Sequence, residues 1–199
     1  MIKLIIALAV CLSWPGVPNK KRTDFGSYKN VCRIDRVKTP LTPMELLVAL
    51  NEGHYQKFGK YPSDKRLAVG WAQVALENGR GKYTYNYNFG KIKASKHRIH
   101  YVQKHRFRAH ATAIEGTEDY WNVVNKMCKR SLRAFDAGAP ETAANMLSSC
   151  GYFGADKKRY GRAMRKLYRR AIRKLIPQLK QTSHQDEILA RLPQFPSLY

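Results

Sequence analysis

Apolar and polar residues alternate along much of this chain with the period of helices that bury one face. The first such stretch is MELLVALNEGHYQKFG, preceded by Thr42-Pro43, where a capping-box pattern and a proline at the first helical position predict a helix start. Ser63 can cap a second helix, DKRLAVGWAQVALE, with apolar residues on one face and a stop at Asn78-Gly79. The pattern therefore predicts a helical pair between residues 42 and 78.

The period then changes to two, because Tyr83, Tyr85, Tyr87 and Phe89 alternate with smaller or polar residues, and Ile99, Tyr101 and Phe107 follow in a very basic stretch. This region is predicted to form a small β-lobe or hairpin between the helices. Further helices are expected in TEDYWNVVNKMCKRSLRAF, ETAANMLSSCG and KKRYGRAMRKLYRRAIRKLIPQLK. Helices on both sides of a small hairpin predict an α+β fold, mainly helical, with a crease between its two lobes.

The two ends of the chain are predicted to lie outside the ordered domain. Residues 1–16, MIKLIIALAVCLSWPG, resemble an export signal, so we expect a periplasmic or extracellular protein. The alternatives are a lipoprotein signal ahead of Cys11 and an apolar N-terminal strand or anchor that is retained. Residues 17–40 are predicted to be a basic linker or an arm lying on the domain, 41–180 the ordered domain and 181–199 a C-terminal tail.

Charge narrows the class of partner. Lysine and arginine outnumber acidic residues 37 to 14, which gives a formal charge of +23 and predicts attraction to a polyanion. Nucleic acid, anionic lipid and the acidic polymers of a bacterial envelope all qualify. For an exported protein the cell envelope is the favoured partner of this basic surface, and nucleic acid is the less favoured one.

The cysteines and histidines raise the questions of a disulfide and of a metal site. In an oxidising compartment Cys128 and Cys150 are the preferred disulfide, since both lie in the helical second half, with Cys32 left over; buried free thiols are the alternative. The histidines at 97, 100, 105 and 110 lie among lysines and arginines, without cysteine or carboxylate neighbours. We therefore predict no metal site and no cofactor.

Glu77 is the first candidate for chemistry. It follows Val74 by three residues and Leu67 by ten, so it points with the apolar stripe of its helix. A carboxyl group partly withdrawn from water is typical of a general acid. The alternative is a solvated glutamate at a helix C-terminus, where the helix dipole is mildly unfavourable.

Short motifs, in the same order as in the family, resemble the glucosaminidase family, glycoside hydrolase family 73 of the lysozyme superfamily. Glu77-Asn78-Gly79-Arg80-Gly81 is similar to its ALE-S/T-G-W-G segment, and Asn88-Phe89-Gly90-Lys91-Ile92-Lys93 to its N-x-F-G-I-K segment. Downstream, Phe107-Arg108, Glu115 to Tyr120, and Cys150-Gly151-Tyr152 with Tyr160 are similar to FR-x-Y, E-x-x-x-DY and AGYATD-x-x-YA. The resemblance covers residues 42 to 172 and implies a lysozyme-like fold with the hairpin lobe beside an active-site cleft.

This resemblance implies that Glu77 is the catalytic general acid and that Tyr152 lies close to the cleaved sugar. Asn88 and Phe89 would form one wall of the cleft, while Tyr160 is assigned to the apolar face of the last helix. Tyr85 and Tyr87 suit sugar stacking as well as strand formation.

A second carboxylate, which glycosidases normally place across the bond, is missing from Lys91 to Arg106. The resemblance, together with this absence, implies a peptidoglycan hydrolase that cleaves β-1,4 bonds of the glycan strands with a single glutamate. The alternatives are a non-catalytic cell-wall glycan-binding domain and, third, a basic nucleic-acid-binding protein.

Overall fold

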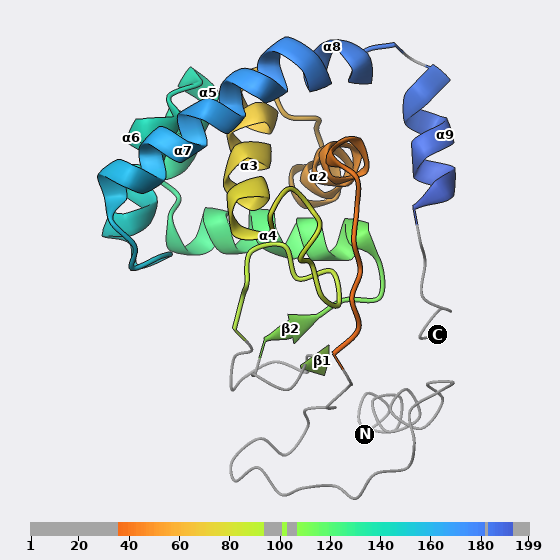
Figure 1. Ribbon diagram of the computed structural model, residues 1–199, viewed down its shortest axis with the longest axis horizontal. Helices are drawn as coiled ribbons and strands as arrows, with labels where there is room; N and C mark the ends of the chain where they lie inside the picture. Colours follow the sequence, from red (N-terminus) through yellow and green to blue (C-terminus); the bar gives the residue numbers. More distant parts are fainter. Residues whose placement is uncertain (1–35, 94–100, 103–106, 182, 193–199) are drawn as a thin grey trace, which may run out of the picture.

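The computed structural model describes residues 36–93, 101–102, 107–181 and 183–192 (Figure 1). The predicted export signal, most of the basic linker, Cys32 and the histidines at 97, 100 and 105 lie outside the described residues. The helices are α2 (Pro43–Phe58), α3 (Asp64–Glu77), α4 (Ala113–Met127), α5 (Ser131–Ala137), α6 (Pro140–Ser149), α7 (Lys157–Arg170), α8 (Ile176–Leu179) and α9 (Ser183–Arg191), with a π-helical segment η1 (Ala171–Leu175) between α7 and α8. The described chain is thus mainly helical.

The predicted helix starts at Thr42 and Ser63 are confirmed. Thr42 Oγ1 accepts a hydrogen bond from the Glu45 backbone N–H, and the Glu45 carboxylate accepts one from the Thr42 N–H, which completes the capping box. Ser63 Oγ accepts a hydrogen bond from the Arg66 N–H at the start of α3. These local signals are sufficient because each cap satisfies backbone donors that the first helical turn leaves free.

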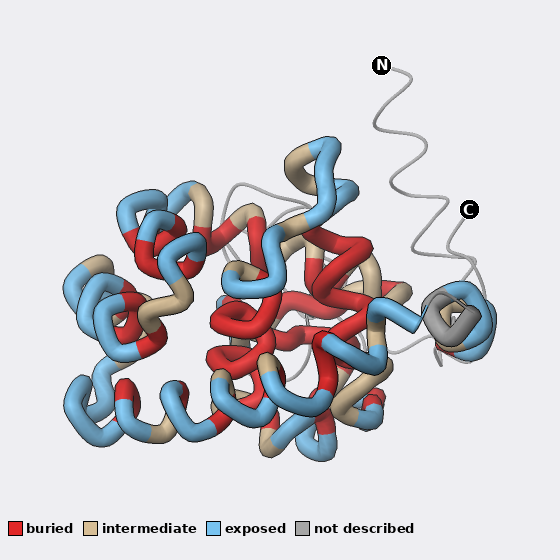
Figure 2. The backbone as a smooth tube through the Cα atoms, turned by 90° about the horizontal axis from the view of Figure 1, so that it is seen from above, coloured by how far each residue is buried: buried red, intermediate tan, exposed pale blue. Residues whose placement is uncertain are grey.

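Helix α3 forms the centre of the core. Every residue from Leu67 to Ala75 is buried, although the sequence predicted one buried face. The helix packs against α2, α5 and α7, and the horizontal α4 passes behind its lower end in Figure 1. Burial is concentrated in the interior elements, while the outer helices turn exposed residues outward (Figure 2). A helix enclosed on all sides presents its side chains to solvent only near its ends, and Glu77 lies at one of them.

The β structure is smaller than predicted and is confined to the later part of the predicted lobe. Residues 81 to 90 form turns, and the only strand pair in the described residues joins β1 (Tyr101–Val102) to β2 (Arg108–Ala109) in antiparallel register. The β prediction is therefore confirmed around Tyr101 and Phe107 and wrong for strands over Tyr83 to Phe89. Positive φ angles of 48° at Asn86 and 49° at Tyr87 explain this result, because a strand cannot continue through two left-handed residues.

The long helix predicted through residues 117–135 is two helices. Helix α4 ends at Met127 and α5 begins at Ser131, with Cys128 at the break. The Cys128–Cys150 disulfide is present, as preferred from the sequence, and it joins the end of α4 to the end of α6 with the two Cα atoms 5.6 Å apart. The bond therefore ties together two helix C-termini.

The basic helix predicted over residues 157–180 is present as the continuous run α7–η1–α8 (Figure 1). Its π-helical segment precedes Pro177, whose ring has no N–H and clashes with the carbonyl one α-helical turn earlier. The expected tail also contains structure: α9 occupies part of it, and Leu192 beyond it is buried. None of the helices in the described part of the chain combines the length and apolarity that a bilayer crossing requires.

Candidate functional site at Glu77

Glu77 is the last residue of α3, and its side chain retains 17% of its accessible surface. The segment that follows reverses at once, because Gly79, Arg80 and Gly81 have positive φ angles of 56°, 62° and 92°. The buried Asn78 holds the returning loop: its side-chain N–H₂ donates to the Phe89 carbonyl, and its own carbonyl accepts from the Tyr83 N–H at 3.0 Å. The carboxylate therefore lies at the border between the core and solvent.

Two groups contact the Glu77 carboxylate. The Tyr160 hydroxyl, from the first turn of α7, donates a hydrogen bond of 2.7 Å to Oε1. The Lys91 ammonium lies 3.6 Å from Oε2 and is itself 55% exposed. The phenol bond is the stronger positional constraint, because Tyr160 is buried whereas an exposed lysine pair is weakened by solvent.

Aromatic side chains surround the carboxylate. Tyr160 stacks on Phe153, with ring centroids 3.8 Å apart and planes inclined by 14°. Burial raises the pKa of the Tyr160 phenol, and the negative charge of Glu77 raises it further. The phenol therefore remains a donor throughout the physiological pH range.

Tyr152 belongs to the same group, as predicted. Burial raises the pKa of its phenol, with additional contributions from the charges of Glu77 and then Asp119, so it lies within the field of both carboxylates. Its hydroxyl is 3.4 Å from the Gly90 carbonyl oxygen, a long hydrogen bond. A Cβ at Gly90 would lie 2.4 Å from that hydroxyl oxygen, so only glycine permits this approach. The loop after α3 and the α6–α7 loop therefore meet at Gly90 and Tyr152.

A buried layer supports these groups from the core side. Tyr120, fully buried on α4, donates a hydrogen bond of 2.5 Å to the side-chain oxygen of Gln73. Gln73 precedes Glu77 by one turn of α3, so the two side chains share a helix face. Burial raises the pKa of Tyr120, and Tyr152, Tyr160 and Glu77 contribute in that order. The layer is therefore close to all three.

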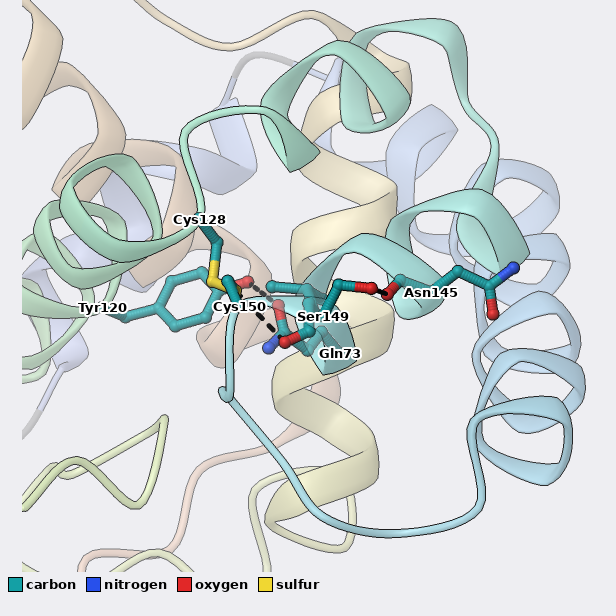
Figure 3. Close-up of a disulfide and its surroundings, with 7 residues drawn as sticks. Gln73, Tyr120, Cys128, Asn145, Ser149 and Cys150 are labelled. Carbon is teal, nitrogen blue, oxygen red and sulfur yellow. Dashed lines mark hydrogen bonds between the residues drawn. A yellow bond between two sulfur atoms is a disulfide. The ribbon is translucent and has the colours of Figure 1, made fainter.

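The disulfide lies beside this layer. Figure 3 shows Cys128 and Cys150 next to the hydrogen-bonded Tyr120 and Gln73. Cys150 precedes Tyr152 by two residues, and the Tyr152 N–H donates to the Leu147 carbonyl at 3.0 Å. The loop that carries Tyr152 is therefore fixed at its start by a covalent bond and a backbone hydrogen bond.

Three residues predicted to contact substrate lie in the interior instead. Tyr87, Asn88 and Phe89 are 2%, 4% and 0% exposed. The Asn88 amide accepts from the Ile92 N–H at 2.7 Å and donates to the carbonyls of Ile92 and Arg108 at 2.8 and 2.9 Å. A side chain without accessible surface cannot stack on a sugar, so these positions shape the loop rather than the surface that a ligand would touch.

The close packing of this loop on α4 has a local cause. A Cβ at Gly116 would lie 2.0 Å from the Tyr87 carbonyl oxygen and 3.1 Å from the Phe89 ring, so the loop approaches α4 over a glycine. The Asn88 N–H also donates a hydrogen bond of 3.0 Å to the Tyr85 carbonyl, which closes a turn. The two left-handed residues inside this turn match the backbone of a type I′ turn.

Tyr85 is partly exposed, but its contacts lead away from Glu77. The Arg36 guanidinium lies 3.6 Å from the centre of its ring, and Tyr85 forms an isolated β-bridge with Lys38. The segment that contains these two basic residues pairs along the loop, with the Thr39 N–H donating to the Thr84 carbonyl at 3.0 Å. Of the two interpretations of residues 17–40, the described end is thus an arm lying on the domain.

Asp119 is a second carboxylate near the site. Arg108 Nη1 donates to Asp119 Oδ1 at 2.5 Å, and His110 Nε2 lies 3.5 Å from Oδ2. Arg108 also donates to the Lys93 carbonyl at 3.2 Å, so it fastens the loop and β2 to α4. With a guanidinium on one oxygen and an imidazole near the other, Asp119 is engaged within the fold and joins β2 to α4.

No group of three histidine, cysteine or carboxylate side chains within the described residues is arranged to hold a metal ion. Of the histidines at 97, 100, 105 and 110, the structure describes His110, and its ring lies beside the Asp119 carboxylate. The arrangement at Glu77 is that of a carboxyl group beside phenols, with one ammonium, and such a carboxyl group can exchange a proton or form hydrogen bonds.

Sequence reasoning missed Tyr160, which it assigned to an apolar face. The only signal was a hydroxyl within an otherwise apolar stripe, together with the second tyrosine of the AGYATD-x-x-YA pattern. It also missed Lys91, Phe153 and the Arg108–Asp119 pair, which joins the FR-x-Y and E-x-x-x-DY segments in space.

No family model, curated protein or solved structure matches this chain.

Proposed function

We propose that this protein cleaves the β-1,4 glycosidic bonds of peptidoglycan glycan strands, with a lysozyme-like fold and Glu77 as general acid and base. The observation that carries the proposal is the Glu77 carboxyl group at the end of a buried helix, held by the Tyr160 phenol at 2.7 Å. The partly exposed rings of Tyr152 and Phe153 nearby offer the aromatic surface that pyranose rings prefer. The motifs that resemble the glucosaminidase family support the same assignment.

In the first step the Glu77 carboxyl group donates its proton to the bridging oxygen as the bond from that oxygen to the sugar C1 breaks. No aspartate or glutamate lies between Lys91 and Arg106, and Asp119 is held by Arg108. The nucleophile is therefore supplied by the substrate, either its N-acetyl carbonyl oxygen or its 6-hydroxyl group. In the first route, Glu77 then removes a proton from a water molecule that attacks C1 and breaks the bond between C1 and the N-acetyl oxygen. In the second, it removes the proton of the 6-hydroxyl as that oxygen bonds to C1 and closes a 1,6-anhydro ring.

The proposed location is outside the cytoplasm. The Cys128–Cys150 disulfide is typical of proteins that fold in an oxidising compartment, and this supports the export expected from the first 16 residues. Peptidoglycan is the polymer that an exported glycosidase of this kind would meet there.

Turbidity loss of purified peptidoglycan, compared between the native protein and Glu77→Gln, tests the proposal. The control is Glu141→Gln, which removes the same charge from an exposed glutamate at the start of α6. We expect clearing by the native protein and the control, and none by Glu77→Gln. Analysis of the released ends then distinguishes hydrolysis from anhydro-ring formation. Equal clearing by Glu77→Gln would exclude Glu77 from the mechanism.

A second candidate is a non-catalytic glycan-binding domain. It is favoured by the Lys91 ion pair, because a carboxylate held by both a phenol and an ammonium has the contacts of a binding group. In that case neither protein would clear the suspension, and both would sediment with the wall polymer.

A further inference from the structure

The outward face of α7 carries a line of cations. Lys158, Arg162, Arg165 and Arg169 follow one another at intervals of four, three and four residues, which places them on one side of the helix. We call these four residues the cationic stripe; all four are exposed, and the line is about 16 Å long at 1.5 Å per residue. Six further exposed cations flank it: Lys157, Arg159, Lys166, Arg170, Arg173 and Lys174.

Little negative charge within the protein offsets the stripe. In the part of the chain that the structure describes, Arg165 pairs with Glu141 at 3.5 Å, and both side chains are about half exposed. The stripe therefore presents guanidinium groups to solvent, and arginine is the side chain best suited to bind carboxylates in a bidentate way.

The stripe lacks the features of two other polyanion-binding surfaces. The apolar side of α7, with Tyr160, Met164 and Leu167, is buried in the core, so the helix cannot place an apolar face in lipid. Residues 157–174 contain no asparagine, glutamine or tryptophan; Tyr160 is buried and the partly exposed Tyr168 packs against the core, so amide readout and stacking of bases have little support. The surface recognises negative charge and little else.

The stripe and Glu77 lie on opposite sides of α7, at its first turn. Tyr160, which bonds Glu77, projects from α7 opposite Lys158 and Arg162. A ligand group attached to a sugar at Glu77 would have to pass around half the circumference of the helix, about 16–19 Å for a diameter of 10–12 Å. A peptide of four or five residues spans at most about 14–18 Å, which brings its terminal carboxylate to the near edge of the stripe.

We propose that the cationic stripe binds the carboxylates of the peptide side chains that branch from a peptidoglycan glycan strand while the strand lies at Glu77. The inference rests on the proposed function, because only a polymer that carries both sugars and acidic peptides joins the two surfaces. It assigns the substrate class of the site: peptide-bearing strands are preferred to bare glycan.

The experiment measures binding by co-sedimentation and fluorescence anisotropy, using Glu77→Gln so that the ligand stays intact. The ligands are peptidoglycan fragments freed of phosphate polymers and the same glycan strands after amidase removal of the peptides. The stripe variant combines Lys158→Gln, Arg162→Gln and Arg169→Gln, which are three residues of the stripe, with Arg173→Gln at a flanking cation, and it leaves the Arg165–Glu141 pair in place. The control removes the same charge from four exposed cations around the α4–α5 break: Lys126, Lys129, Arg130 and Arg133.

At low salt we expect the parent protein to prefer peptide-bearing fragments by about tenfold, since four exposed ion pairs worth about twofold each multiply to that order. The preference should disappear in the stripe variant and in high salt but persist in the control. Equal affinity for both ligands, or equal losses in the stripe variant and the control, would overturn the proposal. Stripe-dependent binding only to phosphate-bearing walls, anionic vesicles or single-stranded DNA would overturn it too, by identifying another polyanion.

Failure of this inference can be separated from failure of the proposed function. Binding is measured without cleavage, so a peptide preference that depends on the stripe supports the inference even if the native protein clears no wall. Conversely, clearing that depends on Glu77 without any effect of the stripe variant would reject the inference alone.

Discussion

Replacing Tyr160 with phenylalanine isolates the contribution of its hydroxyl to the Glu77 site. The change removes the 2.7 Å hydrogen bond to Oε1 and retains the ring that stacks on Phe153. A hydrogen bond to a charged group contributes about 1.5–3 kcal/mol, and about 1.4 kcal/mol corresponds to a factor of ten. If the bond orients the carboxyl group during the reaction, kcat should fall by about 10- to 100-fold.

The assay is turbidity loss of purified peptidoglycan with saturating substrate, together with thermal unfolding of each variant. Tyr168→Phe is the matched control, because it makes the same change on the same helix at a partly exposed position. We expect this control to keep native activity. A Tyr160→Phe enzyme within threefold of the native kcat, in a background where Glu77→Gln is inactive, would refute the role of the phenol.

Three further predictions concern the scaffold. Burial and the Arg66 charge lower the pKa of His54 from 6.5 to about 4, so the unfolded chain binds the proton more readily than the folded protein. The free energy of unfolding should therefore fall by up to about 3 kcal/mol between pH 6.5 and 4. Denaturant titrations of His54→Gln should lack this decrease. Replacing both Cys128 and Cys150 with serine should lower the free energy of unfolding by about 3 kcal/mol, given the separation of 22 residues. Wall clearing should also be reduced, because Tyr152 follows Cys150 by two residues. A variant of unchanged stability would contradict this. Asn88→Ala should cost about 2–3 kcal/mol of unfolding free energy by leaving buried backbone groups unpaired, and unchanged stability with a raised KM would instead restore the predicted role in sugar contact.

The sign of the His54 prediction follows from its contacts. Its Nδ1–H donates to the Lys60 carbonyl at 2.8 Å, and Nε2 accepts from Arg66 at 3.1 Å, so the neutral ring is the form that the fold holds. The Arg66 charge opposes a second proton, while Asp136, paired with Arg66 at 2.5 Å, compensates in part. Stability from this histidine is complete above pH 6.5 and is lost as the pH falls toward 4.

Local signals in the sequence predicted most of the helices, and long-range contacts decided the rest. Thr42 and Ser63 were predictable because their hydroxyls bond to backbone groups three residues away. The Tyr83 to Phe89 segment was misinterpreted because the alternation of residue types is not an alternation of burial: Tyr83 is exposed, whereas residues 86–89 are all buried within a turn. Nothing nearby in sequence indicated that Asn88 bonds to Arg108, twenty residues later.

The same division applies to the site. Glu77 and Tyr152 were found from their motifs, and the structure places both in one group. Tyr160 was not assigned, because its stripe on α7 is apolar and its partner is 83 residues away. A hydroxyl within an apolar stripe is ambiguous until the facing element is known, and here the facing element ends in a carboxylate.

The site is built from three segments that meet at the end of one buried helix, and each segment has its own tether. Asn78 binds the returning loop through the Phe89 carbonyl, the Cys128–Cys150 disulfide holds the start of the Tyr152 loop, and Tyr160 joins α7 to Glu77. Because α3 is enclosed on all sides, loss of one tether leaves the core in place and loosens only the geometry around Glu77. Tethers that act on one group should also be coupled, so the loss of kcat on adding Tyr160→Phe to the disulfide-free variant should be smaller than the loss in the native protein.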